Sequence, residues 1–267
     1  MKRLVLLVAF LAALLFGCDG GGPQSANELL GETSANLGKI KSGDLALELV
    51  FSTKDGERAG FNLEGPFQLR PGSLPEAQLD YTQIAGDQTA TQTFIMTGDK
   101  AYVRMGGATF ELPAETAGEV RSTLGATGGL GVIDLRGWVQ DPELAAGEEV
   151  GGAETDRITG HLNVATVVTG LVAIASQFGG TTPLTPLEGK SAEQVEQAVD
   201  RATMDVWTGK EDRLLRKLEI TIEFSPAAEQ VQSLVGTAVH FTLGIANPNE
   251  KVTIEKPTNV QPYSPGS

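Results

Sequence analysis

The stretch Leu45-Ala-Leu-Glu-Leu-Val-Phe51 places a large apolar residue at every second position. Successive side chains of a β-strand point to opposite faces, so these apolar residues share one face. A turn-forming segment, Lys54-Asp-Gly56, comes next. The same period then returns at Phe61, Leu63, Phe67 and Leu69. The two segments therefore predict a β-hairpin with one apolar face.

Further segments repeat this two-residue period: 77–84, 90–97, 100–104, 152–162, 202–208, 214–224 and 239–245. Apolar residues at helical spacing occur in 27–41, in 114–140 with a break at 125–131, in 164–178 and in 191–199. Asn27 is the expected cap of the first helix, and Ser191 with Gln194 forms a capping box for the last. Regular alternation of apolar and polar residues is typical of antiparallel strands that have one buried face and one solvent-exposed face. The sequence therefore predicts an α+β fold, with a curved antiparallel sheet and helices on its concave side.

An apolar concave face can be completed in two ways. The helices can fill it and make an ordinary packed core, or they can fill it in part and leave a dry cavity for an apolar guest. The residues alone leave both arrangements open.

The amino end has the features of an export signal. Lys2 and Arg3 precede an apolar run, 4–16, which is short for a membrane span but suits a signal peptide. Leu15-Phe16-Gly17-Cys18 then resembles a bacterial lipobox, in which the Cys thiol is acylated and cleavage occurs just before it. Phe16 is larger than the residue usual at its position, and an ordinary signal followed by an incidental Cys is the alternative.

The order of segments predicts the organisation of the chain. Residues 1–17 are the expected lipoprotein signal peptide, and 18–26 are the lipidated Cys18 with a Gly-rich flexible tether. Residues 27–267 show no second low-complexity stretch and are expected to form a single domain. The protein is then held by its lipid anchor at the extracytoplasmic face of the cell membrane.

Charge and composition exclude several classes of function. The formal net charge of -14, from 34 acidic and 20 basic residues, argues against a nucleic-acid partner. One Cys and two His leave little material for a disulfide framework or a metal site. The sequence lacks a Gly-x-Ser-x-Gly elbow, a phosphate-binding Gly-rich loop and a His-Glu-x-x-His pair. We therefore expect no catalytic residues, no metal and no cofactor, and we expect His161 and His240 on polar faces.

A family resemblance rests on the lipobox, the Gly-rich tether and four later segments: Leu63-Glu-Gly65-Pro-Phe67, Gly147-Glu-Glu-Val-Gly-Gly-Ala-Glu-Thr-Asp-Arg-Ile-Thr-Gly-His-Leu162, Asp205-Val-Trp207 and Leu214-Leu-Arg-Lys-Leu218. Together they resemble the LppX/LprAFG (LprG-like) family of actinobacterial lipoproteins. The resemblance implies a strongly curved antiparallel half-barrel with helices on its concave side. It also implies a membrane-anchored protein that binds acylated lipid or glycolipid, with chains such as palmitate, and carries it across the cell envelope. A membrane transporter is a further candidate partner.

On this interpretation the inner strand residues and the helices over them line the cavity. The expected wall residues from strands are Leu47, Leu49, Phe61, Leu63, Phe67, Phe94, Val206, Leu218, Ile220 and Ile222. Those from the helix over the sheet are Val167, Leu171 and Ile174. The alternative is a lipid-tethered interaction or sensor module, whose core is solid and holds no ligand.

Overall fold

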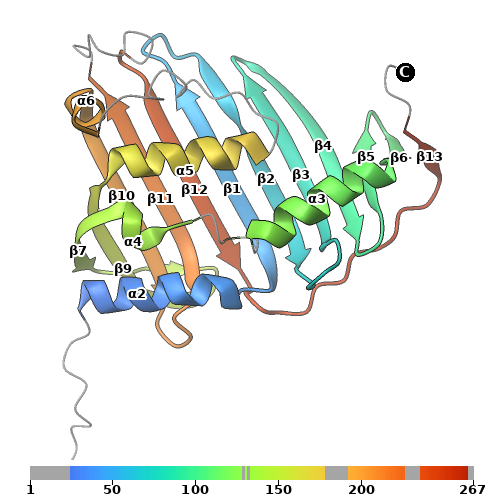
Figure 1. The fold of residues 1–267 in the computed structure, drawn as a ribbon, viewed down its shortest axis with the longest axis horizontal. Helices are drawn as coiled ribbons and strands as arrows, with labels where there is room; N and C mark the ends of the chain where they lie inside the picture. Colours follow the sequence, from blue (N-terminus) through green and yellow to red (C-terminus); the bar gives the residue numbers. More distant parts are fainter. Residues whose placement is uncertain (1–24, 128–129, 131–132, 178–191, 226–234, 264–267) are drawn as a thin grey trace, which may run out of the picture.

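The structure is a computed structural model that describes residues 25–127, 130, 133–177, 192–225 and 235–263. Within these residues one large sheet is covered on one face by helices (Figure 1). The strands are β1 Ser42–Ser52, β2 Arg58–Gln68, β3 Glu76–Ala85, β4 Gln88–Thr97, β5 Ala101–Met105, β6 Ala108–Glu111, β7 Val139–Ala145, β8 Glu149–Val150, β9 Ala153–Leu162, β10 Val199–Gly209, β11 Leu215–Phe224, β12 Ala238–Ala246 and β13 Val260–Pro262. The helices are α2 Ala26–Asn36, the short 3₁₀ helix η1 Leu37–Lys39, α3 Ala114–Thr127, α4 Leu135–Trp138, α5 Val164–Gln177 and α6 Ala192–Gln197.

Strand β1, which contains the stretch Leu45–Phe51, lies in the middle of the sheet. It pairs with β2 on one side and β12 on the other, so Leu49 stands between Phe61 and Phe241. The order across the sheet is β13-β6-β5-β4-β3-β2-β1-β12-β11-β10-β9-β7, with β8 paired to β9. In the described part of the chain, every pairing is antiparallel except that of β13 with β6. The predicted antiparallel character is therefore confirmed.

The sheet is open, with β13 and β7 at the two ends of its order. Both edge strands contain a proline, Pro262 in β13 and Pro142 in β7. Asp141, beside Pro142, has a φ of 46° where the pairing with β9 is irregular. Proline donates no backbone hydrogen bond, and an irregular edge is a poor template for another strand. Both edges are thus unsuited to pairing with a second chain.

The core lies between the sheet and the helices. Side chains from α2, α4, α5 and α6 form one buried cluster with alternate strand residues, and we call that side of the sheet the inner face. The outer face carries mainly polar residues, such as the aligned Glu48, Thr242 and Glu219. The prediction that helices cover one face of the sheet is confirmed (Figure 1). Curvature strong enough to make the sheet a half-barrel stays a prediction.

The first helix begins earlier than predicted. Its cap is Ser25 and not Asn27: Ser25 Oγ accepts from Glu28 N at 3.2 Å, and Glu28 Oε2 accepts from Ser25 N at 3.0 Å. This reciprocal capping box gives hydrogen-bond partners to two backbone N–H groups of the first turn. A cap at Asn27, two residues later, cannot bond these same groups. The helix therefore starts at Ala26, inside the segment assigned to the tether.

Two further helical predictions are corrected. The second helix expected within 114–140 is only α4, because Val139 already pairs with Leu162 at the start of β7. The helix expected over 191–199 ends at Gln197, and Val199 begins β10. Its predicted cap, Ser191, lies outside the described residues.

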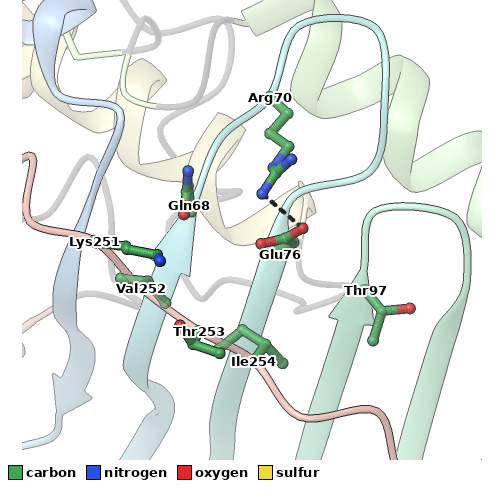
Figure 2. A pocket seen from close by; sticks show the side chains of 8 residues that line it. All are labelled: Gln68, Arg70, Glu76, Thr97, Lys251, Val252, Thr253 and Ile254. Carbon is green, nitrogen blue, oxygen red and sulfur yellow. Dashed lines mark ion pairs between the residues drawn. The ribbon is translucent and has the colours of Figure 1, made fainter.

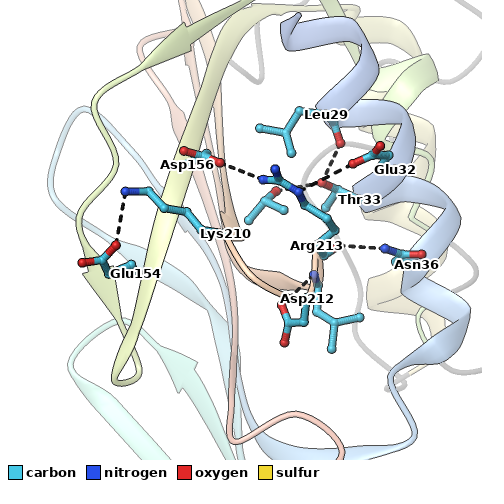
Figure 3. Close-up of polar contacts among 11 residues, drawn as sticks. Leu29, Glu32, Thr33, Asn36, Glu154, Asp156, Lys210, Asp212 and Arg213 are labelled. Atoms are coloured by element: carbon cyan, nitrogen blue, oxygen red, sulfur yellow. Dashed lines mark hydrogen bonds and ion pairs between the residues drawn. The ribbon is translucent and has the colours of Figure 1, made fainter. Parts of the chain in front are cut away.

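Helix α2 is fastened to the end of β10 and the turn after it by polar contacts (Figure 3). Thr33 Oγ1 donates to Leu29 O at 2.8 Å and lies 2.7 Å from Thr208 Oγ1, and both threonines are fully buried. Because the one hydroxyl proton of Thr33 goes to Leu29, Thr208 is the donor in the second bond. Arg213, in the turn after β10, adds an ion pair with Glu32 of α2 at 3.7 Å. The amino-terminal helix is therefore held by specific bonds as well as by apolar packing.

Thr33→Val is expected to lower the free energy of unfolding by about 1–3 kcal/mol, because the Thr208 hydroxyl is then buried without its partner. Changing both threonines to valine is expected to cost less than the sum of the two single changes, since neither polar group remains. Urea unfolding of the four proteins, followed by tryptophan fluorescence, measures this. Additive costs would show that the two hydroxyls are not bonded to each other.

Candidate functional site

The residues predicted to line a cavity lie together in the structure. All but Phe94 are buried members of the core between sheet and helices. Residues far apart in the sequence belong to this cluster, such as Phe61 of β2, Leu171 of α5 and Ile220 of β11. The predicted wall residues are thus one cluster, and their role in enclosing a lipid stays a prediction.

The inner face of β1 and β9 to β12 is well covered, and Leu45 at one end of β1 is partly buried. The register aligns one apolar row across these strands: Leu47, Leu243, Leu218, Val206 and Ile158. None of these side chains is more than 8% exposed. Helix α5 crosses in front of these strands (Figure 1). We call this part the closed half, and a guest there has to displace the protein's own side chains.

The inner face of β3 to β6 is covered less well. Leu79, Phe94, Val103 and Phe110 form a cross-strand row, and Tyr81 lies two residues along β3 from Leu79. Val103 is buried, whereas the other four are partly exposed. Met105, on the same face of β5, is 38% exposed. We call the partly exposed residues of this face the open patch: Leu79, Tyr81, Phe94, Met105 and Phe110.

Aromatic rings connect the open patch to the core. The Tyr81 ring stacks on Phe61 with centroids 5.7 Å apart and meets Phe94 edge-on at 6.2 Å. Phe61 is buried in the core cluster. At the edge of the sheet, Phe110 meets the Tyr263 ring at 6.3 Å. The open patch and the core therefore form one continuous apolar surface, of a kind that suits hydrocarbon.

The thinner cover over the open patch follows from the residues of α3. In Figure 1, α3 crosses in front of β3 to β5. Among its residues with a described side chain, Ala117 is buried and Val120 is partly buried. Helix α5 instead buries larger side chains, among them Leu171 and Ile174. Small side chains reach less far from a helix axis, so α3 leaves the sheet residues beneath it partly exposed.

Sequence reasoning found Phe94 in the open patch and missed the rest. The alternation within 77–84 places Leu79 and Tyr81 on one face, so a signal for these two was present. The alternation did not predict that these side chains are partly exposed, because their exposure depends on which helix lies opposite the strand.

Burial raises the pKa of the Tyr81 phenol. A raised folded-state pKa favours the neutral phenol, so its contribution to stability is complete below the unfolded pKa of about 10 and is lost as the pH rises through the folded pKa. A hydrocarbon chain laid on the ring is expected to raise this pKa further, since it removes more water. The difference in tyrosinate absorbance between the parent chain and Tyr81→Phe isolates this titration. A midpoint that palmitate leaves unchanged would show that the guest does not cover Tyr81.

The two histidines lie apart from each other on the outer face of the sheet. His161, Thr203, Thr221 and His240 occupy one cross-strand row on the outer face. Three strand spacings, or roughly 14 Å, therefore separate the two histidines along the sheet. Their predicted placement on a polar face is confirmed. Within the described ranges, no group of three or more His, Cys, Asp or Glu side chains is arranged to hold a metal ion.

The predicted anchor, with signal 1–17 and Cys18, lies outside the described residues. Of the helices that the structure describes, none combines the length and the hydropathy needed to cross a bilayer.

Comparison with known proteins gives similarity in structure only. No family model and no curated protein matches the sequence. The structure is similar to LprF from Mycobacterium bovis, with 17% identity, a TM-score of 0.47, and coverage of 87% of this chain and 96% of that one. It is also similar to the lipoprotein LppX from Mycobacterium tuberculosis, with 16% identity, a TM-score of 0.46, and coverage of 86% and 99%. LppX and LprF are also the proteins after which the LppX/LprAFG family, noted above as a resemblance, is named.

Proposed function

We propose that this protein binds an acylated lipid or glycolipid by its hydrocarbon chain and performs no catalysis. The observation that supports the proposal is the open patch, where large apolar side chains remain partly exposed and continue through Tyr81 and Phe61 into the core. Holding a hydrocarbon needs apolar surface of sufficient extent and no fixed constellation of polar groups. The open patch is then the surface that an acyl chain contacts first.

The energetics set how much surface the protein has to supply. A hydrocarbon chain leaving a bilayer exposes its methylenes at ~0.8 kcal/mol each, so a chain of about sixteen carbons faces a cost on the order of 12 kcal/mol. The open patch covers part of such a chain. We propose that the rest is covered by the predicted wall residues, on a sheet curved as a half-barrel, when α3 and α5 move away from it.

The proposed location is the extracytoplasmic face of the cell membrane, with acylated Cys18 as the anchor. From there the protein is proposed to carry its lipid across the envelope, with a membrane transporter as a partner. Cys18→Ala is expected to move the protein from the membrane to the soluble fraction, because the several acyl chains then no longer hold it. Fractionation and immunoblotting measure the shift. Retention of the variant in the membrane fraction would contradict the anchor.

Lipid binding is tested on the chain carrying Cys18→Ala, so that no covalent acyl group is counted as a ligand. The protein is purified from a lipid-containing host, examined by native mass spectrometry and extracted with organic solvent. We expect a bound species that yields acyl chains on extraction. A clean protein mass, together with no uptake of added palmitate, would overturn the proposal.

A second candidate function is a lipid-tethered docking or sensor module. The observation that favours it is the closed half, where the predicted wall residues are almost fully buried by the protein itself. A module of this kind has a solid core and binds no hydrocarbon. The same mass measurement separates the two functions, because the docking module yields the clean mass.

A further inference from the structure

The segment that follows β12 crosses the outer face of the sheet and forms one wall of an open pocket there (Figure 2). We call residues 250–259, which lead from β12 to β13, the strap. The pocket has a volume of about 370 Å³. It is lined by Gln68, Arg70, Glu76 and Thr97 from β2 to β4 and by Lys251, Val252, Thr253 and Ile254 from the strap. The pocket is thus on the opposite side of the sheet from the open patch.

The strap is fixed at both ends, so the pocket exists without any closing motion. Next to its first residue, Asn249 Oδ1 accepts from Lys41 N at 2.8 Å, and Asn249 N donates to Ser42 O at 2.8 Å. Ser42 Oγ also donates to Glu250 O at 2.6 Å. Beyond the strap, β13 pairs with β6. A ligand therefore finds the two walls of the pocket already held at their separation.

The charges that line the pocket favour an anion. Arg70 and Lys251 are cationic, and Glu76 is the acidic residue of the lining. Glu76 Oε1 lies 2.9 Å from Arg70 Nη2, which orients the guanidinium and leaves its other donors for a ligand. Lys251 is exposed and forms no ion pair within the residues that the structure describes. The lining therefore has a surplus positive charge in a chain whose net charge is -14.

Besides the two cations, the pocket contains neutral hydrogen-bond donors that can bind the oxygen atoms of an anion. In Figure 2, Gln68 lies between Lys251 and Arg70 and carries an amide group. Thr253 adds a hydroxyl from the strap. A guanidinium, an ammonium and neutral donors together match the several acceptor oxygens of a phosphate group better than a single carboxylate or a hydrocarbon.

We propose that the pocket beneath the strap binds a phosphate group between Arg70 and Lys251. The group is supplied either by the headgroup of a phospholipid or by a soluble phosphate, and the chemistry of the contact is the same in both cases. This site does not depend on hydrocarbon binding at the inner face, because it uses different residues on the opposite face.

The test compares two lysine variants of the strap in the chain carrying Cys18→Ala. Lys251→Glu changes a residue that lines the pocket, whereas Lys256→Glu makes the same charge change outside it. The probes are inorganic phosphate in equilibrium dialysis and phosphatidylglycerol vesicles in sedimentation. We expect Lys251→Glu to weaken binding at least about tenfold and Lys256→Glu to change it by less than about twofold. Lys251→Gln is expected to give a smaller loss than Lys251→Glu.

Each outcome decides one point. Binding of phosphate that Lys251→Glu removes supports the site and shows that a soluble phosphate is sufficient. Binding of the vesicles alone, with the same dependence on Lys251, supports the site and assigns its ligand to a lipid headgroup. If both lysine variants weaken binding equally, the proposal is overturned, because binding then depends only on the overall charge of the protein. The absence of binding to either probe would also overturn it.

Discussion

Phe94→Glu is expected to abolish the uptake of an acyl chain while the protein remains folded. In the free protein Phe94 is partly exposed in the open patch, so a carboxylate there keeps its water. In the complex it is covered by hydrocarbon, and burial of an unpaired charge costs several kcal/mol. A cost of about 3 kcal/mol corresponds to more than a hundredfold in affinity. Displacement of a fluorescent fatty acid by palmitate measures the loss.

The matched control for this prediction is Thr89→Glu. Thr89 lies on the same strand as Phe94 but on its outer face, where it is exposed. The variant therefore carries the same added charge away from the open patch, and its palmitate affinity is expected to stay within about twofold of the parent. If the two variants lose affinity equally, or if Phe94→Glu loses none, the guest does not lie on the open patch.

Phe241→Ala is expected to cause the largest loss of stability, about 3–5 kcal/mol, because it empties a fully buried site in the closed half. Its neighbours Leu49 and Ile220 lie in paired strands on either side and cannot both move into the space. Phe94→Ala is expected to cost about 1–2 kcal/mol, since part of its surface already contacts water. Urea unfolding of both variants measures the difference.

This pair of alanine variants also distinguishes the two proposed functions. A small cost at Phe94 and an increase in unfolding free energy on addition of palmitate are the results expected of a lipid-binding protein. Equal costs at Phe94 and Phe241, with no effect of palmitate, would show that the open patch is packed as firmly as the core. The docking module would then be the better account of the protein.

The sequence predicted much of the sheet because most long strands have one face buried and the other exposed. In β1 the period-two pattern of Leu47, Leu49 and Phe51 is the direct result of a strand with one side against the core. The same reasoning located β9 to β12 and helix α5. It applies wherever a segment is long enough for the alternation to be distinguished from a helical stripe.

The elements that the sequence did not predict are short or depend on distant partners. Strand β13 has three residues and pairs in parallel with β6, so its sequence carries almost no periodic signal. The sequence predicts helix up to residue 140, where β7 has already begun, because alternation stops there and Leu135 and Trp138 have helical spacing. The open patch and the pocket under the strap arise where separate segments meet. The pattern of residues within one segment does not indicate which distant segments it will contact.

The central position of β1 has a consequence for the order in which the molecule folds. A chain is synthesised from its amino end, so Leu49 can meet Phe61 early, whereas Phe241 is added much later than either. The hairpins from β1 to β6 are local and fast to form, but the contact of β1 with β12 closes a very long loop. Until that contact forms, the future centre of the sheet is a bare edge open to aggregation.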